Sequence, residues 1–154
     1  MIIDPELQLF GVNKLNILLF GRPGSGKSAF INSIASTLIN NYVELASTSA
    51  AQESFTQHIS QIPINENQNL MVIDVFGFSD DNFNKQLLDL LVKGQLKDGY
   101  KQGDPLDPKS LINSPLISDE IHAVLFVMDA TNIDKKMVTS DYVKYIKEFQ
   151  SRGL

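Results

Sequence analysis

Long apolar runs alternate with polar segments along this chain, in a pattern that predicts buried strands alternating with helices. Residues 15–20, 70–74 and 121–129 are almost wholly apolar and are predicted to be buried strands, and a weaker strand is predicted over 55–61, ending at Ile62-Pro63. Apolar residues at helical spacing predict helices over 29–39, 83–93 and 138–149, with stops at Asn40-Asn41, Gly94 and Gly153. This alternation is typical of an α/β protein.

The connection between the first strand and the first helix is Gly21-Arg22-Pro23-Gly24-Ser25-Gly26-Lys27-Ser28, which fits a phosphate-binding pattern. Its glycines allow consecutive N–H groups to approach a β-phosphate in front of a helix N-terminus. Lys27 can reach the β- and γ-phosphates, and the Ser28 hydroxyl can ligate Mg²⁺. The loop therefore predicts nucleotide binding by these residues: Gly21, Gly24, Ser25, Gly26, Lys27, Ser28 and Ala29.

A second chemical feature follows the strand at 70–74. Asp74 ends this strand, where a carboxylate can hold Mg²⁺ through water, and Gly77 completes Asp74-Val75-Phe76-Gly77, in which a glycine N–H can sense a γ-phosphate. The next residue is Phe78, and a phenyl ring cannot orient an attacking water. The catalytic residues are therefore unknown, and hydrolysis is expected to be slow.

Two segments lack clear periodicity. Residues 41–54 are polar and suit either a nucleotide switch loop, with Thr48 as the first choice for contacting Mg²⁺ and the γ-phosphate, or an ordinary linker. The Gly- and Pro-punctuated stretch 94–118 is too long for an ordinary connection, which leaves open a partner-binding or lid insertion and a surface loop over the core.

Composition narrows the classes of function. The 154 residues suit one domain, and the absence of cysteine excludes disulfides and cysteine-based metal sites. A net charge of −5 without a Lys/Arg cluster does not favour nucleic acid binding. No apolar run approaches the roughly 20 residues that span a bilayer, and the N-terminus lacks a signal-peptide pattern. We expect a cytoplasmic protein with no transmembrane segment.

The sequence resembles the GTP-binding domain of the interferon-induced protein 44 family over residues 14–153. The resemblance rests on residues 16–21, 24–32, 74, 77–79, 93–94, 98–100 and 119–130. It implies a three-layer P-loop NTPase (GTPase-like) fold, with a mostly parallel sheet and one antiparallel edge strand. Residues 1–13 would be a lead-in, and residues 14–154 would form a partial P-loop GTPase-like domain.

The same resemblance implies the ligands and a role in the immune response. GTP or GDP would bind with Mg²⁺, with phosphate held by residues 24–28 and Mg²⁺ held at Ser28 and Asp74. Thr48 or Ser49 would supply the switch contact.

The family's fold continues with a strand that bears a base-recognition motif of the Thr-His-x-Asp kind, which this chain does not reach. We therefore expect C-terminal strands to be missing, so that the strand at 121–129 becomes an exposed edge. The chain would then be a fragment, or would depend on a homo-oligomer or a protein partner that covers this edge.

The predicted function is GTP binding with slow, Mg²⁺-dependent hydrolysis or a nucleotide switch, and two alternatives stay open. A P-loop ATPase or small-molecule kinase shares the loop but needs a basic lid and substrate-binding arginines, whereas the arginines here are Arg22 and Arg152. A non-catalytic interaction module that keeps the loop for folding is favoured by Phe78 and by the missing base-recognition strand.

Overall fold

A computed structural model describes residues 12–46, 57–65, 68–78, 83–132 and 136–154. The strands in these ranges are β1 (Leu15–Phe20), β2 (Ser60–Pro63), β3 (Leu70–Asp74) and β4 (Ala123–Phe126). The helices are α2 (Lys27–Ile39), α3 (Lys85–Val92) and α4 (Lys136–Gln150), and the short 3₁₀ turns are η1 (Ile117–Asp119) and η2 (Ala130–Asn132).

The four strands form one sheet in the order β2-β3-β1-β4. β1 pairs in parallel with both β3 and β4, whereas β2 pairs antiparallel with β3 at one edge. The register places Leu19 opposite Asp74, so that the carboxyl ends of β1 and β3 lie side by side. The mostly parallel sheet with one antiparallel edge strand is therefore confirmed.

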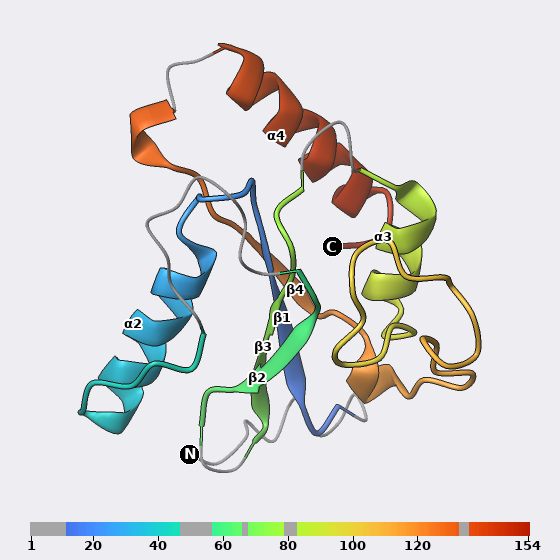
Figure 1. Cartoon of the computed structure of the whole chain (residues 1–154), viewed down its shortest axis with the longest axis horizontal. Helices are drawn as coiled ribbons and strands as arrows, with labels where there is room; N and C mark the ends of the chain where they lie inside the picture. Colours follow the sequence, from blue (N-terminus) through green and yellow to red (C-terminus); the bar gives the residue numbers. More distant parts are fainter. Residues whose placement is uncertain (1–11, 47–56, 66–67, 79–82, 133–135) are drawn as a thin grey trace.

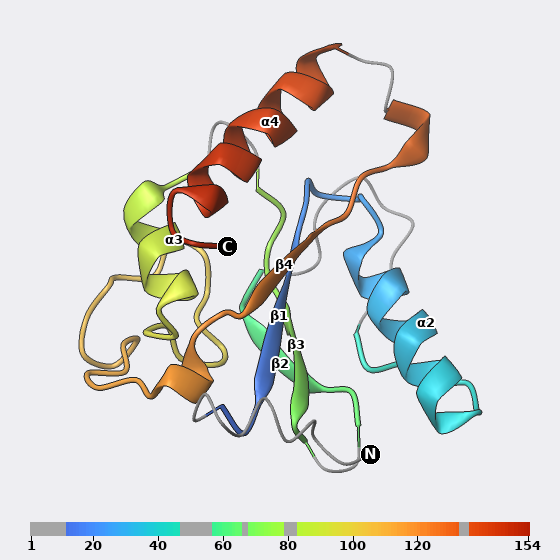
Figure 2. The same ribbon diagram turned by 180° about the vertical axis from the view of Figure 1, so that it is seen from behind.

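Helices cover both faces of the sheet, as Figures 1 and 2 show from opposite sides. Side chains on β1 alternate between the two faces: Leu18 and Phe20 enter the core beneath α3 and α4, whereas Leu19 packs with Ile31 on the α2 side. All four of these side chains are fully buried. Burial of both strand faces explains why β1 is apolar without alternation, and it confirms the three-layer α/β fold.

The helix ends follow the sequence signals closely. Asn40 adopts a left-handed conformation at the end of α2, with φ +55°, and Gly94 does so after α3, with φ +62°. α3 begins later than residue 83 because the Asn84 side chain caps it, accepting a hydrogen bond from the Leu87 N–H at 3.2 Å. Helices in the described ranges are too short or too polar to cross a membrane.

The segment 94–118 folds back along the outer side of β2. The Ile59 N–H donates to the Tyr100 carbonyl and the Gly99 N–H donates to the Ile59 carbonyl, each at 2.8 Å, while the Gln61 N–H donates to Asp98 Oδ1 at 2.8 Å. Residues 55 and 56 lie outside the described residues. In the described part, β2 starts at Ser60, later than the predicted strand, because these bonds occupy the backbone of Ile59. The geometry favours the surface-loop interpretation, since the segment is tied to the sheet along this edge.

β4 lies at the opposite edge, as predicted, and is shorter than the apolar run 121–129. Ile121 donates its N–H to Val92 at the end of α3 instead of extending the strand pairing. Among the described residues, no strand pairs with the outer side of β4. Leu125 and Met128 leave 41% and 40% of their surface exposed there, which is a large fraction for apolar residues at a sheet edge.

Candidate functional site

The loop between β1 and α2 makes a tight turn in front of the α2 N-terminus (Figure 1). Gly24 and Gly26 have φ values of +73° and +97°, a conformation that side-chain-bearing residues rarely adopt. The Ser25 N–H donates to the Arg22 carbonyl at 3.2 Å and closes the turn. Gly26 is the N-cap, and no side chain caps the helix. The amides at the start of α2, including that of Ala29, have no intrahelical acceptor and can receive an anion.

Lys27 lies folded back along this loop. Its Nζ donates to the carbonyls of Gly21 at 3.1 Å and Arg22 at 3.2 Å, and only 6% of the residue is exposed. Burial lowers the pKa of Lys27 because it penalises the charged ammonium, while the neighbouring Asp74 carboxylate opposes this shift. A cation with two carbonyl partners and one carboxylate neighbour therefore stands at the helix N-terminus.

Ser28 and Asp74 come together at the ends of α2 and β3. The Ser28 hydroxyl lies 3.4 Å from Asp74 Oδ2, and Asp74 is only 3% exposed. Both groups offer oxygen atoms, the ligand type that Mg²⁺ prefers. In the described ranges, no group of three or more His, Cys, Asp or Glu residues could hold a metal ion. The pair therefore fits a cation that takes few protein ligands and completes its shell with phosphate and water.

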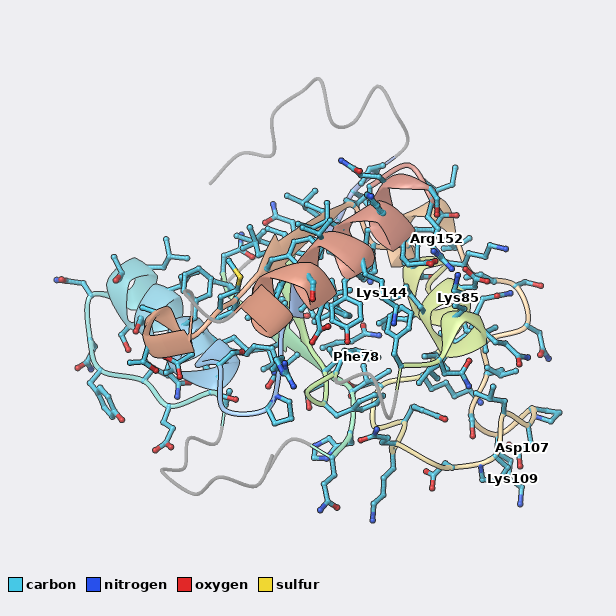
Figure 3. The ribbon with its side chains drawn as sticks, turned by 90° about the horizontal axis from the view of Figure 1, so that it is seen from above. Phe78, Lys85, Asp107, Lys109, Lys144 and Arg152 are labelled. Carbon is cyan, nitrogen blue, oxygen red and sulfur yellow. The ribbon has the colours of Figure 1, made fainter. Side chains whose placement is uncertain are left out.

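The segment after β3 runs directly against the phosphate loop. A Cβ atom on Gly77 would overlap the backbone of Pro23, so the two chains can approach this closely only with glycine at 77. The Phe78 N–H donates to the Gly21 carbonyl at 3.2 Å, which is also an acceptor for Lys27. Gly77 thus lies beside the loop, and the Phe78 ring points into the core beneath α4 (Figure 3).

Helix α4 contacts the loop from the other side. Arg22 Nη1 pairs with Asp141 Oδ2 at 3.1 Å, and the Tyr142 hydroxyl accepts the Arg22 N–H at 3.2 Å and donates to the Val127 carbonyl at 2.7 Å. Both residues lie in the helix predicted over 138–149, and neither was singled out as a site residue. No local signal marks either residue, because their partner lies more than a hundred positions away in the chain.

The predicted switch residues Thr48 and Ser49 lie outside the described residues. The described chain leading toward them is fixed by Asn32 of α2. Its Oδ1 accepts the N–H groups of Leu45 and Ala46, each at 2.9 Å, and its Nδ2 donates to the Ala46 carbonyl at 2.7 Å. Asn32 is buried, and sequence reasoning did not assign it this role.

Comparisons with known proteins found one family model and several related proteins. A model of the protein family described as 50S ribosome-binding GTPase matches residues 16–152. Interferon-induced protein 44-like of Homo sapiens is 29% identical over 135 residues, which is 80% of this chain and 30% of that protein. Interferon-induced protein 44 is 27% identical over 80% of the chain in Pan troglodytes and 28% identical over 79% in Homo sapiens. The chain spans about 30% of the length of these relatives. No solved structure matches it significantly.

Proposed function

This chain belongs to the 50S ribosome-binding GTPase family, and we propose that it binds a guanine nucleotide with Mg²⁺ at the loop between β1 and α2. The curated relatives confirm the resemblance to interferon-induced protein 44. The convergence of Lys27, Ser28 and Asp74 at the uncapped N-terminus of α2 supports the proposal most directly. The residues proposed to contact the nucleotide are Gly21, Gly24, Ser25, Gly26, Lys27, Ser28, Ala29, Thr48, Asp74 and Gly77.

The phosphate tail would be bound by backbone amides and by the Lys27 ammonium. The first-turn amides of α2 lack intrahelical acceptors, and the positive end of the helix dipole favours an anion there. Lys27 now donates to two backbone carbonyls, which are weaker acceptors than a charged phosphate oxygen. Exchange of these carbonyls for phosphate would restore full charge pairing to a buried ammonium.

Mg²⁺ would be held by the Ser28 hydroxyl and, directly or through water, by the Asp74 carboxylate, with Thr48 as a further proposed ligand. When bound, the ion would neutralise charge on the phosphate oxygens. Ser28 Oγ and Asp74 Oδ2 lie 3.4 Å apart, so one ion could contact both oxygens. The Asp74 carboxylate also acts electrostatically on Lys27, because its charge opposes the lowering of the Lys27 pKa by burial.

Hydrolysis by this chain would be slow. The position after Gly77 holds Phe78, whose side chain is fully buried and cannot reach a water near the phosphates. A nucleotide switch and a non-catalytic interaction module both remain compatible with this arrangement. They differ in whether association with a partner depends on nucleotide, and Lys27→Ala distinguishes them. If the chain is a switch, this variant loses association with its partner; if the chain is a non-catalytic module, the variant keeps it.

The kinase alternative loses support from the placement of the two arginines. Arg22 pairs with Asp141, and Arg152 pairs with Asp89 and Glu148. Arginines held in such pairs are not available to clamp a second phosphorylated substrate.

The exposed β4 edge supports the further proposal that a second copy or a protein partner covers it, because Leu125 and Met128 expose apolar surface there. Ribosome binding is part of the family's description and is not extended to this chain, because the net charge of −5 does not favour contact with RNA. The cytoplasmic location stays a prediction.

Titration of a fluorescent GTP analogue tests nucleotide binding at this loop. We expect saturable binding that strengthens with Mg²⁺, and loss of binding in Lys27→Ala. The matched control is Lys97→Ala, because Lys97 lies in the segment 94–118 and donates to the carbonyls of Pro108 and Lys109, away from the loop. Equal binding by wild type and Lys27→Ala would overturn the proposed site.

A further inference from the structure

We propose that Asp141 and Tyr142 of α4 are positioning residues that hold the phosphate loop in its binding conformation through Arg22. This inference rests on the proposed nucleotide site and adds to it a part of the chain that does not touch the phosphates. Asp141 and Tyr142 are successive residues on α4, and both bond to the same loop residue, one to its side chain and one to its backbone.

The Tyr142 hydroxyl uses both of its hydrogen-bonding capacities here. It accepts the Arg22 N–H at 3.2 Å and donates to the Val127 carbonyl at 2.7 Å, so it bridges the loop and the chain that leaves β4. Tyr142 is only 3% exposed, which shields both bonds from water. The loop is thereby fixed to two separate elements through one oxygen atom.

The ion pair adds a second, independent link. Asp141 is largely buried, and among the described residues its carboxylate has the Arg22 guanidinium as its ion-pair partner at 3.1 Å. A buried carboxylate without its cation is unfavourable, so the pair restrains Arg22 more strongly than a surface pair would. It also directs the guanidinium toward α4 and not toward the phosphate-binding amides.

The two contacts to Arg22 lie next to the loop carbonyls that accept hydrogen bonds. Lys27 donates to the carbonyls of Gly21 and Arg22, and the Phe78 N–H donates to that of Gly21. A shift of Arg22 would therefore displace the two carbonyls that hold the ammonium and the backbone that precedes Gly24. The consequence is that nucleotide affinity depends on the α4 contacts although α4 supplies no ligand.

The variants Tyr142→Phe and Asp141→Asn test this proposal against Glu148→Gln, which lies on the same helix. Glu148 pairs with Lys85 and Arg152 between α3 and α4, away from the loop, as Figure 3 shows for the two basic residues. All three variants remove polar contacts of α4, but only the first two touch Arg22. We expect each of these two to weaken binding of the GTP analogue by about tenfold, the factor that loss of one or two hydrogen bonds gives.

Amide hydrogen exchange of the nucleotide-free protein supplies a readout that does not need ligand. Tyr142→Phe should speed exchange of the Arg22 amide and its loop neighbours, whereas Glu148→Gln should leave the loop at the wild-type rate. Unchanged affinity and unchanged loop exchange in Tyr142→Phe would overturn the positioning role while leaving the proposed function intact. If Tyr142→Phe speeds loop exchange but the wild-type protein binds no nucleotide, the positioning role is supported and the proposed function is overturned.

Discussion

The ring of Phe78 stacks on the ring of Phe20, with 4.6 Å between the ring centroids and 17° between the ring planes. Phe78 also lies beside Phe76 and Phe83, and its side chain is fully buried. The residue that follows Gly77 therefore anchors the end of the phosphate-adjacent segment in the aromatic core beneath α3 and α4. Its ring packs in the core, and its backbone N–H donates to the Gly21 carbonyl of the phosphate loop.

Replacement of Phe78 by glutamine should therefore destabilise the fold without creating a catalyst. The change removes a buried ring and places an amide in an apolar core, so we expect the free energy of unfolding to fall by about 3–5 kcal/mol in urea denaturation. Phe30→Gln is the control, because Phe30 is partly exposed on α2 and its loss should change stability by less than about 1 kcal/mol. Faster phosphate release by folded Phe78→Gln would contradict the account.

Asp74→Asn should separate Mg²⁺ binding from phosphate binding. The substitution keeps the shape of the side chain but removes the charge that faces Ser28 and Lys27. We expect the Mg²⁺ concentration that gives half-maximal tightening of GTP-analogue binding to rise by about tenfold or more. Asp107→Asn, in the segment 94–118, should keep the wild-type value. The same Mg²⁺ dependence in Asp74→Asn and wild type would count against Asp74 as an ion-binding residue.

Stability should fall on mild acidification because of His122. Its Nδ1 accepts the Asn16 N–H at 3.0 Å, which requires an unprotonated nitrogen. Burial lowers the pKa of His122 below its ordinary value of 6.5, and the opposing effect of Glu120 is smaller. The unfolded chain therefore binds more protons than the folded chain below about pH 6.5, so this contribution to stability is present above that pH and is lost as the pH falls.

Urea denaturation between about pH 7.5 and pH 5 measures this dependence. His122→Asn should flatten the pH profile of the unfolding free energy relative to wild type. His58→Asn is the control, because His58 is exposed on the chain before β2, and it should retain the wild-type profile. An unchanged profile in His122→Asn would show that other groups cause the acid sensitivity.

The outer edge of β4 should determine the association state. Sedimentation velocity over a range of protein concentrations is expected to show self-association that Leu125→Lys disrupts, because a charge at an edge strand opposes pairing. Leu116→Lys is the control, since Leu116 is exposed before η1 and lies outside β4. A chain that stays monomeric in dilute solution and unfolds cooperatively at high temperature would contradict the need for a partner at this edge.

Short-range patterns in the sequence account for the centre of the site. The strand before Gly21, the helix after Lys27 and the carboxylate at the end of β3 are each encoded within a few residues, so their types and positions were predictable. The sheet then brings Ser28 and Asp74 together simply because β1 and β3 pair in parallel at matching ends. Local sequence patterns and the parallel pairing of β1 with β3 were therefore sufficient to predict this part of the candidate site.

Contacts between distant parts of the chain were not predictable in the same way. Tyr142 reads as an apolar helix residue, and only the docking of α4 against the loop reveals what its hydroxyl bonds to. The segment 94–118 binds β2 mainly through backbone groups such as those of Ile59 and Tyr100, which leave no side-chain pattern in the sequence. The pairing partners of such groups depend on the tertiary fold, so a single sequence does not specify them.

Competition between GTP and ATP analogues for this chain, measured in Mg²⁺ with Lys27→Ala as the control, tests the central claim most directly. The account predicts that the fluorescent GTP analogue and unlabelled GTP both bind, and that GTP displaces the analogue at lower concentration than ATP does. Lys27→Ala should bind neither the analogue nor GTP. Equal displacement by ATP and GTP would contradict guanine selectivity while retaining the phosphate site. Absence of any Lys27-dependent binding would contradict the claim that this loop is a nucleotide site.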